Sequence, residues 1–393
     1  MKLAVIGKGT VGSLAILHFL TYTDWDIDWV SDPNTPTTAV GEGTTIRVPS
    51  ALANSILKFS HDDLIAMNGT PKVGIWKENW GGGKKYLHPF PIDLSGLHFN
   101  AIEFQNKVFE MLQGNQRITM VNERVTDPQS YSADYVMVCS GSPKDLDEYN
   151  ILDSIVVNSA YVTQCFWDAP TFNYTLTLAR PWGWVFGIPL QNRCSIGYVY
   201  NSDFVSLDEI KEDVKNVFEQ YNLTPSDTTN HLEFKNYVRK NNFTSKVVYN
   251  GNASFFLEPL EATSTTTADD VSRFAYDMWK GNISVDEANR KHLRNIEEVL
   301  DMIALHYCNN IVYRNDFWDN AIRISCNRIK NSLDTNSDFQ DLIHNSIQGT
   351  ENMLSVLGLS DPVHYGTWSW KSWNINVKNL QIKRTLKYLM GEK

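Results

Sequence analysis

The order of apolar and polar positions at the start of the chain predicts a strand, a tight turn and a helix. Residues 2–7 (KLAVIG) form an apolar run that ends in glycine, and residues 10–21 (TVGSLAILHFLT) carry apolar side chains at helical spacing. Residues 26–30 (DIDWV) form a second apolar run. Because side chains repeat every two residues in strands and every 3.6 residues in helices, this opening is expected to form a β-α-β unit.

The rest of the chain divides by the type of its periodicity. Strand-like runs dominate the middle of the chain, at 117–125, 134–142, 154–164, 174–179, 182–190 and 194–200. Helical spacing is found at 206–221 and, after residue 265, at 267–279, 284–308 and 337–358. We therefore expect an α/β protein with a mixed body to about residue 265 and a helical C-terminal unit. Ser60, Asn100 and Ser206, each three positions before an acidic residue, are expected to cap helices.

Composition and charge narrow the classes of function. Of the 393 residues 42% are hydrophobic, which is enough for one large or two interlocked domains. The formal net charge of −10 argues against nucleic acid or an anionic membrane as a partner, since both need a basic surface. No apolar run approaches a membrane span and no signal peptide is visible, so a cytoplasmic location is expected. The five cysteines show no disulfide or metal-site spacing, and we interpret them as reduced thiols.

The sequence GKGTVG (7–12) has the context that a dinucleotide site requires. It follows the first strand and opens the helix, so Gly7, Gly9 and Gly12 would let a pyrophosphate approach the backbone at the helix N-terminus. Thr10 is assigned to the same cofactor site. Alone the pattern is weak, because glycine turns also simply join strands to helices.

Two later features bear on the same cofactor. A dinucleotide site usually has an acidic residue at the end of the second strand, where this chain has Ser31. Asp32 follows one position later, and we assign it to the ribose. The run VVYNGNASFFLEPL (247–260) and the strand at 134–142 resemble two strands of the flavoprotein monooxygenase superfamily. In that superfamily an Asp hydrogen-bonds the ribityl chain, and Asn252 replaces it here. An ordinary strand end and turn explains this piece alone equally well.

Four more motifs follow in order along the chain: VGEGTT (40–45), GTPKVGIWKENW (69–80), RPWGWVFGIPL (180–190) and FLEPLEATST (256–265). Together with GKGTVG they resemble the flavin-dependent halogenase family, typified by the tryptophan halogenases. The segments YLHPF (86–90) and YRNDFWDNA (313–321) are similar to that family too. Five matches in order are far more specific than any one of them.

The resemblance implies a cofactor and a division of the chain. Residues 1–265 would form an FAD-binding, Rossmann-like body of the flavoprotein monooxygenase type, with a strand-rich substrate region inserted at about 70–120 and 150–205. Residues 266–393 would be a helical region on the substrate side. The further flavin-binding residues that it implies are Gly41, Glu42, Gly43, Thr44, Trp184 and Phe186. No nicotinamide-binding repeat is visible, so reduced FAD is expected from a separate flavin reductase.

The resemblance also implies the chemistry. Reduced FAD, O₂ and a halide would give hypohalous acid, which Lys72 would activate for electrophilic halogenation of a small electron-rich aromatic substrate. A desolvated lysine can donate a hydrogen bond to hypohalous acid as an ammonium, or form a haloamine as an amine. Glu261 would stabilise the cationic ring or remove its proton.

The halide would bind beside Glu261. The implied site is the backbone of Thr263 and Ser264, ahead of a helix expected to be capped by Thr267 with Asp270 at its third position. Ser264 stands where the family usually has glycine, and would be strained if that position required a positive φ. Bromide and iodide are easier to oxidise than chloride, so we favour them.

Other interpretations stay open. An aromatic hydroxylase on the same scaffold is one of them, because the glycine motifs do not distinguish it from a halogenase. Phe186 replaces the second tryptophan of a wall that in the family separates substrate from flavin, and we expect the wall to survive because phenylalanine preserves the bulk. A catalytically idle flavin-binding protein is a third possibility. Lys72 alone would pass for a solvated strand-end lysine, and Glu261 for a glutamate in the first turn of a helix. A homodimer is the default expectation for assembly.

Overall fold

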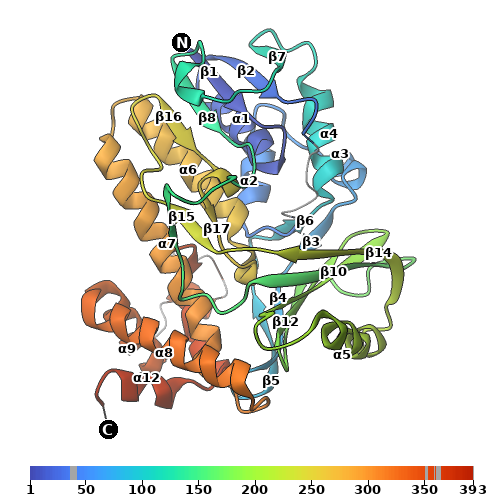
Figure 1. Ribbon diagram of the computed structural model, residues 1–393, viewed down its shortest axis with the longest axis vertical. Coiled ribbons are helices and arrows are strands. Elements are labelled where there is room, and N and C mark those ends of the chain that lie inside the picture. Colours follow the sequence, from blue (N-terminus) through green and yellow to red (C-terminus); the bar gives the residue numbers. More distant parts are fainter. Residues whose placement is uncertain (36–41, 350–352, 358, 360–363, 393) are drawn as a thin grey trace. The chain divides into compact units, whose positions relative to one another are not determined.

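A five-stranded parallel sheet forms around the first predicted strand. Lys2–Ile6 (β1) pairs with Asp26–Ser31 (β2) on one side and with Tyr135–Val138 (β8) on the other. Ile118–Asn122 (β7) and Val247–Tyr249 (β16) form the edges, so the order is β16-β8-β1-β2-β7 (Figure 1). This doubly wound order reverses beside β1, and in such sheets ligands bind at the carboxyl ends of the strands where the order reverses. The predicted Rossmann-like α/β fold is confirmed.

The structure is a computed structural model that describes residues 1–35, 42–349, 353–357, 359 and 364–392. The chain packs as two units, each built from three separate segments. Unit 1 comprises Met1–Thr70, Leu97–Ile151 and Tyr237–Ile296, and unit 2 comprises Pro71–Gly96, Leu152–Asn236 and Glu297–Lys393. Three elements span the points where the chain passes between units: Thr70–Lys72 (β3), Gly96–His98 (β6) and Val285–Tyr307 (α7). The functional division predicted at residue 265 stays a prediction.

Unit 1 surrounds the parallel sheet with helices and short strands. They are Thr10–Tyr22 (α1), Arg47–Asn54 (α2), His61–Ala66 (α3), Ala101–Leu112 (α4), Tyr149–Ile151 (β9), Tyr237–Arg239 (β15), Phe255–Phe256 (β17) and Ser264–Trp279 (α6). Alternation along β1 decides which side chains meet them. Leu3 and Val5 belong to the apolar cluster shared with α1, α4 and α6, whereas Ala4 and Ile6 belong to the cluster on the opposite face. The short apolar runs therefore have both faces covered, as parallel strands require.

Unit 2 is built on a seven-stranded mixed sheet. Its strands are Gly74–Trp80 (β4), Lys84–Pro89 (β5), Ser159–Phe166 (β10), Thr175–Arg180 (β11), Gly183–Pro189 (β12), Arg193–Tyr200 (β13) and Thr224–Glu233 (β14). Their order is β14-β10-β13-β12-β11-β4-β5, with only β11 and β4 parallel among the described pairs. Leu207–Gln220 (α5) packs on this sheet through Ile210, Val214 and Val217, which share an apolar cluster with strand residues.

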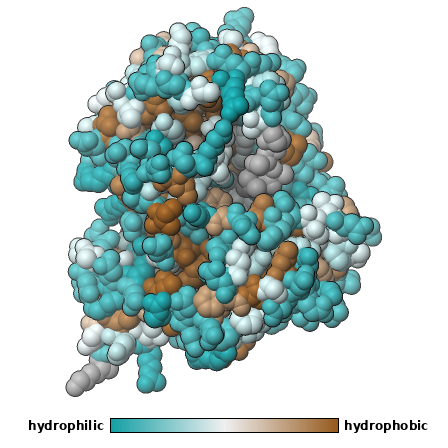
Figure 2. Space-filling view, viewed as in Figure 1, coloured by the Kyte–Doolittle hydropathy of each residue, from teal (hydrophilic) through white to brown (hydrophobic). Residues whose placement is uncertain are grey.

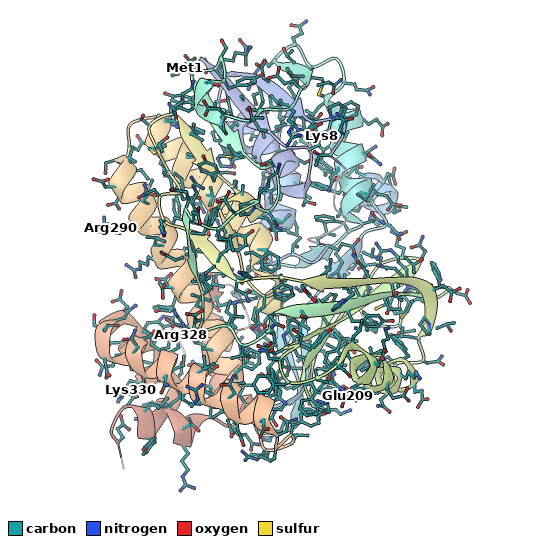
Figure 3. All side chains as sticks on the ribbon, viewed as in Figure 1. Met1, Lys8, Glu209, Arg290, Arg328 and Lys330 are labelled. Carbon is teal, nitrogen blue, oxygen red and sulfur yellow. The ribbon has the colours of Figure 1, made fainter. Side chains whose placement is uncertain are left out.

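The C-terminal part of unit 2 is helical, as predicted. Its elements are Asp316–Thr335 (α8), Ser337–Gln348 (α9), Met353–Val356 (α10), His364–Tyr365 (β18), Trp368–Ser369 (β19), Trp370–Asn379 (α11) and Lys383–Leu389 (α12). Arg328 on α8, labelled in Figure 3, ties this region to the end of α7 through ion pairs of 2.9 Å with Glu297 and with the buried Asp301.

Most predicted elements are present, and two details differ. The six strands predicted between 117 and 200 correspond to β7, β8, β10, β11, β12 and β13. Ser60 and Ser206 form full capping boxes, and Asn100 accepts two backbone hydrogen bonds at the start of α4. The strand β14 was not predicted, because its polar residues lie exposed at an edge and carry no apolar pattern. Lys72 ends the short strand β3, and the alternating strand that it was expected to head begins two residues later, at Gly74.

On the face of the molecule shown in Figure 2 hydrophilic residues predominate, and hydrophobic residues form smaller groups between them. Among the helices of the described ranges, none has the length and apolar character that crossing a membrane would need.

The strand-to-helix turn after β1 depends on close backbone approach. A methyl group at Gly12 would lie 2.2 Å from the carbonyl oxygen of Gly7, and one at Gly7, whose φ is +126°, would lie 2.2 Å from that of Cys139. A methyl group at Gly9 would meet no atom within 4 Å. Gly7 and Gly12 are therefore needed for the fold itself, whereas Gly9 is not.

We expect Gly12→Ala to lower the free energy of unfolding by about 1–3 kcal/mol or more, because the added methyl group overpacks the turn. The matched variant Gly9→Ala should unfold within about 0.5 kcal/mol of the wild type, because its surroundings are open. Urea denaturation followed by circular dichroism measures both. Equal stability of the two variants would contradict the packing assigned to this turn.

Candidate active site

The N-terminus of α1 is an open anion site at the end of β1. Gly9 is the N-cap residue, with φ −67° and no side chain to bond the first amides, and the first turn contains no acidic residue. Unbonded amides at a helix start attract anions such as a pyrophosphate. Beside this turn, Lys8 lies 4.6 Å from the ring centre of Phe109 (Figure 3), and Thr10 is buried and accepts a hydrogen bond from Gln105 at 3.3 Å. These residues fit a dinucleotide.

Asp32 follows the last residue of β2, as its position in the sequence indicated. Its carboxylate accepts hydrogen bonds from the Asn34 amide at 2.8 Å and the Thr35 hydroxyl at 3.1 Å. The hydrogen bond from the Asn34 backbone lowers the pKa of Asp32. Asp32 thus organises the turn after β2, and this turn lies at the same end of the sheet as Gly7, whose amide donates to Val30.

The Glu-Gly-Thr loop packs against the start of α4. Gly41 lies outside the described residues, which begin again at Glu42 and include Gly43 and Thr44. The Glu42 carbonyl accepts from the Phe99 amide at 3.0 Å, and the Thr44 hydroxyl accepts from the Leu97 amide at 2.9 Å. Glu42 and Thr44 are both buried.

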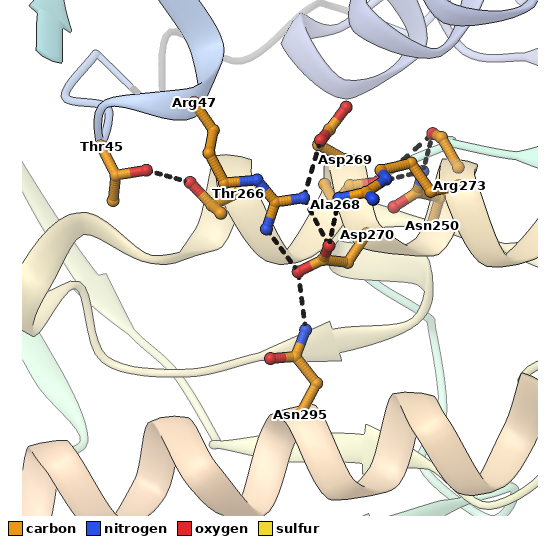
Figure 4. A network of polar contacts seen from close by, with 10 residues as sticks. Thr45, Arg47, Asn250, Thr266, Ala268, Asp269, Asp270, Arg273 and Asn295 are labelled. Atoms are coloured by element: carbon orange, nitrogen blue, oxygen red, sulfur yellow. Dashed lines mark hydrogen bonds and ion pairs between the residues drawn. The ribbon is translucent and has the colours of Figure 1, made fainter. Parts of the chain in front are cut away.

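A polar network joins this loop to α6 (Figure 4). The hydroxyls of Thr45 and Thr266 hydrogen-bond each other, and Arg47 binds Asp270 at 2.5 and 3.0 Å and Asp269 at 3.1 Å. Asn295 on α7 donates to the same Asp270 carboxylate at 3.0 Å. A guanidinium held by two carboxylates in a largely buried position fixes geometry strongly. The loop is therefore clamped to the helix that follows Glu261.

The Asn-Gly-Asn-Ala turn lies against the start of α1. A methyl group at Gly251, whose φ is +59°, would lie 2.9 Å from the Val11 side chain. Asn250 holds the turn by donating to the Ala268 carbonyl of α6 at 3.0 Å, and the Asn252 carbonyl accepts from Tyr237 at 2.8 Å. The packing of Gly251 on Val11 brings Asn252 to the region of the glycine turn.

Glu261 and Ala262 have left-handed backbone conformations immediately before α6. Their φ values are 70° and 53°, and the Glu261 side chain is 2% exposed. Such conformations cost of order 1–3 kcal/mol each and are concentrated at functional sites. The strain that was considered for Ser264 therefore falls on Glu261 and Ala262, because Ser264 has no positive φ and simply begins the helix.

The predicted cap of α6 is wrong. Thr267 and Asp270 lie inside the helix, whose N-cap is Thr263, and the Thr267 amide donates to the Thr263 carbonyl at 2.9 Å. Thr263 makes no side-chain cap hydrogen bond and the first turn has no acidic residue. Thr265 and Thr267 are buried, and their hydroxyls have no hydrogen-bond partner among the described residues. The helix start next to Glu261 therefore offers donors to an anion.

Lys72 is completely buried in unit 2. Its ammonium or amine group lies 5.4 Å from the ring centre of Phe90 and has no hydrogen-bond partner among the described residues. Burial lowers the pKa of Lys72 to about 7. A solvated strand-end lysine is thus excluded, and the side chain carries a neutral amine in a substantial fraction of molecules at physiological pH.

A second buried lysine, Lys77, lies on the neighbouring strand and was not predicted from the sequence. Lys77 of β4 is completely buried and donates to His306, whose other ring nitrogen lies 2.8 Å from the Met302 carbonyl. Burial and the nearby Lys72 lower the pKa of Lys77 well below that of a free lysine, and burial lowers that of His88 likewise. Only the apolar surroundings of Lys77 on β4 could have suggested its burial.

Trp184 and Phe186 share one face of β12. Trp184 is completely buried, with its ring centre 6.3 Å from that of Trp80 and 6.1 Å from that of Phe186. Phe186 pairs with Gly197 of β13, and a methyl group on Gly197 would lie 2.0 Å from the Phe186 ring. The absence of a side chain at Gly197 therefore makes room for the ring.

Each unit gathers a part of the predicted site. In unit 1 the glycine turn, the Glu-Gly-Thr loop, the Asn252 turn and the start of α6 after Glu261 contact one another through α1 and α6. In unit 2 Lys72, Trp184 and Phe186 lie on or next to one mixed sheet. The convergence of Lys72 and Glu261 on one cavity stays a prediction.

Comparisons with known proteins agree with the geometry. The chain is 28% identical over 150 residues to a tryptophan 7-halogenase of Kutzneria sp. (strain 744), covering 37% of this chain and 28% of that protein. It is 28% identical over 165 residues to the tryptophan 7-halogenase of Lentzea aerocolonigenes, covering 39% of this chain and 31% of that protein. These matches span less than a third of the length of either relative.

Solved structures share the fold over nearly the whole chain. A flavin-dependent halogenase from Xanthomonas campestris superposes with a TM-score of 0.77 at 16% identity, covering 99% of this chain and 94% of that one. A flavin-dependent halogenase from Brevundimonas sp. BAL3 gives a TM-score of 0.75 at 19% identity, covering 99% and 95%. The tryptophan halogenase family itself matches residues 2–117 and 105–354. The chain therefore belongs to the tryptophan halogenase family.

Proposed function

We propose that this protein is a flavin-dependent halogenase that uses reduced FAD, O₂ and a halide to halogenate a small electron-rich aromatic substrate, with Lys72 and Glu261 as its catalytic residues. The observation that carries the proposal is the complete burial of Lys72, whose nitrogen has no hydrogen-bond partner among the described residues. A lysine in such a place lowers stability, and buried groups with strongly shifted pKa values are concentrated at functional sites.

The residues of unit 1 fit FAD. The open start of α1 suits the pyrophosphate, the turn after β2 with Asp32 suits the ribose, and the turn at Asn252 suits the ribityl chain. When bound, reduced FAD would supply the electrons that reduce O₂ and allow halide to be oxidised to hypohalous acid. We propose that a separate flavin reductase delivers the reduced cofactor. The clamp between Arg47 and Asp270 would keep the Glu-Gly-Thr loop at a fixed distance from α6.

Lys72 would receive the oxidant. As a neutral amine it can attack the halogen of hypohalous acid, so that an N–halogen bond forms and water leaves with the amine proton. As an ammonium it can instead donate a hydrogen bond to hypohalous acid. A pKa near 7 makes both forms available, and the apolar surroundings, including Phe90, favour the amine.

Glu261 would act at the substrate ring, and the start of α6 would hold the halide. A buried carboxylate stabilises the positive charge that develops on the ring and can accept its proton. The donors of the first turn of α6, beginning at Thr263 and Ser264, suit a halide. We favour bromide or iodide over chloride, because they are easier to oxidise. Trp184 and Phe186 would form the wall between substrate and flavin.

The substitution Gly9→Asp is expected to weaken cofactor binding without lowering the stability of the fold. Aspartate is a preferred N-cap residue, so the variant should be at least as stable as the wild type. Its carboxylate would occupy the pyrophosphate site, and FAD should bind at least about tenfold more weakly, which corresponds to about 1.4 kcal/mol. Fluorescence titration with FAD and thermal unfolding without it provide the measurements. Unchanged FAD affinity would show that the cofactor binds elsewhere.

Substitution Lys72→Met should stabilise the protein in a pH-dependent way. Lys72 has a pKa of about 7 when folded and the ordinary value of about 10.4 when unfolded, so between these values the unfolded state binds more protons. Wild-type stability should therefore rise with pH across this window. The variant should exceed the wild type by about 2–4 kcal/mol at pH 7, since one pKa unit corresponds to about 1.4 kcal/mol, and the gap should close towards pH 10.

Urea unfolding at several pH values measures this difference. Replacement of an exposed lysine, Lys84→Met, is the control and should show no such pH dependence. A Lys72→Met variant that is no more stable than the wild type at pH 7 would contradict the burial of an unpaired lysine.

The predicted meeting of Lys72 and Glu261 can be tested by a kinetic double-mutant cycle. Lys72→Met and Glu261→Gln should each lower bromination of indole or phenol by at least about 10²-fold, and the double variant should lose little more than the worse single variant. Product is measured by mass spectrometry with reduced FAD, O₂ and each halide in turn. Multiplicative losses would mean that the two residues act independently. Oxygenated product that forms without halide would instead identify a hydroxylase.

A further inference from the structure

The cysteines that are scattered in the sequence form two close pairs in unit 2. Cys165 of β10 stands directly opposite Cys194 of β13, and both are completely buried. Cys308, just beyond the end of α7, meets Cys326 of α8. All four are free thiols. Both pairs lie in unit 2 and consist of two thiols, but their surroundings differ.

The second pair has a reactive and a shielded member. Cys326 lies at the margin of the buried stripe of α8, is partly exposed, and its thiol donates to the Cys308 carbonyl across 3.5 Å. Cys308 is 1% exposed. The side-chain interaction between the two thiols lowers the pKa of Cys326 and raises that of Cys308. Thiolate character and access together determine which thiols react with oxidants.

This pair borders the segment that holds the buried lysines. His306, which accepts from Lys77, is two residues before Cys308. Asn310, two residues after it, is completely buried and donates to the Asn79 carbonyl of β4 at 3.3 Å. The residues on either side of Cys308 thus contact β4, the strand that carries Lys77.

We propose that Cys326 and Cys308 form an oxidation site for hypohalous acid, in which Cys326 is oxidised first and Cys308 closes a disulfide. The source of the oxidant rests on the proposed function, whereas the reactivity of the pair does not. The site would consume stray oxidant reversibly, because thiol reductants reopen a disulfide.

The atoms balance in two steps. The Cys326 sulfur takes the halogen of hypohalous acid, so an S–X bond forms, the O–X bond breaks, and water leaves with the thiol proton. The Cys308 sulfur then attacks the Cys326 sulfur, so the S–S bond forms, the S–X bond breaks, and halide leaves with the second thiol proton. The two sulfurs together lose two electrons and the halogen gains them.

The Cys165–Cys194 pair serves as an internal control. Neither thiol is exposed, and burial raises the pKa of Cys165 to about 12, so thiolate is scarce there. Proximity alone would make both pairs react, whereas access and ionisation select Cys326. The comparison separates the two causes within one protein.

The test uses the full chain and hypobromite added directly, so that it does not depend on catalysis. One molar equivalent is added, excess is quenched with methionine, the chain is unfolded in guanidinium chloride so that all remaining thiols are alkylated, and unreduced tryptic peptides are analysed by mass spectrometry. We expect peptides 295–314 and 324–328 to appear cross-linked, with a loss of about two daltons that dithiothreitol reverses. Cys165 and Cys194 should remain fully alkylated.

Variants assign the order of the steps. In the Cys308→Ser variant, Cys326 should be oxidised without forming a cross-link. In the Cys326→Ser variant, Cys308 should keep its thiol. In the Cys194→Ser variant, the Cys308–Cys326 cross-link should form as in the wild type. Unreacted Cys326 in the wild type, oxidised Cys326 beside free Cys308, or equal oxidation of both pairs would each overturn the proposal, and the wild-type result stands even if a variant fails to fold. A cross-link with hypobromite but none during turnover with reduced FAD, O₂ and bromide would leave the thiol site intact and count against the proposed halogenase activity.

Discussion

The close approach of the backbone at Gly7 and Gly12 is the constraint from which unit 1 is organised. It sets α1 directly on the end of β1, and this position determines where the start of α1 at Gly9 points. The Asn252 turn then packs on Val11 of the same helix, and α6 packs beside α1. One steric requirement of the strand-to-helix turn therefore creates the anion site and also gathers the later motifs around it.

Unit 2 is distinguished by the burial of basic groups, which lowers its free energy of unfolding. Lys72, Lys77, His88 and His306 are all completely buried in one unit. Burial shifts each of them towards its neutral form, because a charged group is destabilised where water is excluded. The two units therefore differ in their electrostatics. The start of α1 in unit 1 can donate hydrogen bonds to an anion, whereas the buried bases of unit 2 are destabilised as cations.

The sequence predicted the features that depend on local pattern. The parallel strands and the helices after residue 265 follow from apolar periodicity, and the glycine turn follows from the spacing of its glycines after a strand. The cap of α6 could not be predicted in the same way, because the run at 263–267 offers several hydroxyls that cap equally well. The helix starts at Ser264 because the left-handed residues Glu261 and Ala262 turn the chain just before it. Contacts between distant segments, such as Lys77 with His306 and Arg47 with Asp270, have no local signal at all.

The space that Gly197 leaves for Phe186 has a consequence for the packing of β12 on β13. The Phe186 ring occupies room that any side chain at position 197 would claim, so the two residues are sterically coupled across the strand pair. A larger residue at 197 would force the ring or the strands to shift, because an overpacked site accommodates added atoms only by such displacements. The residue at 197 therefore limits which side chains β12 can carry at 186.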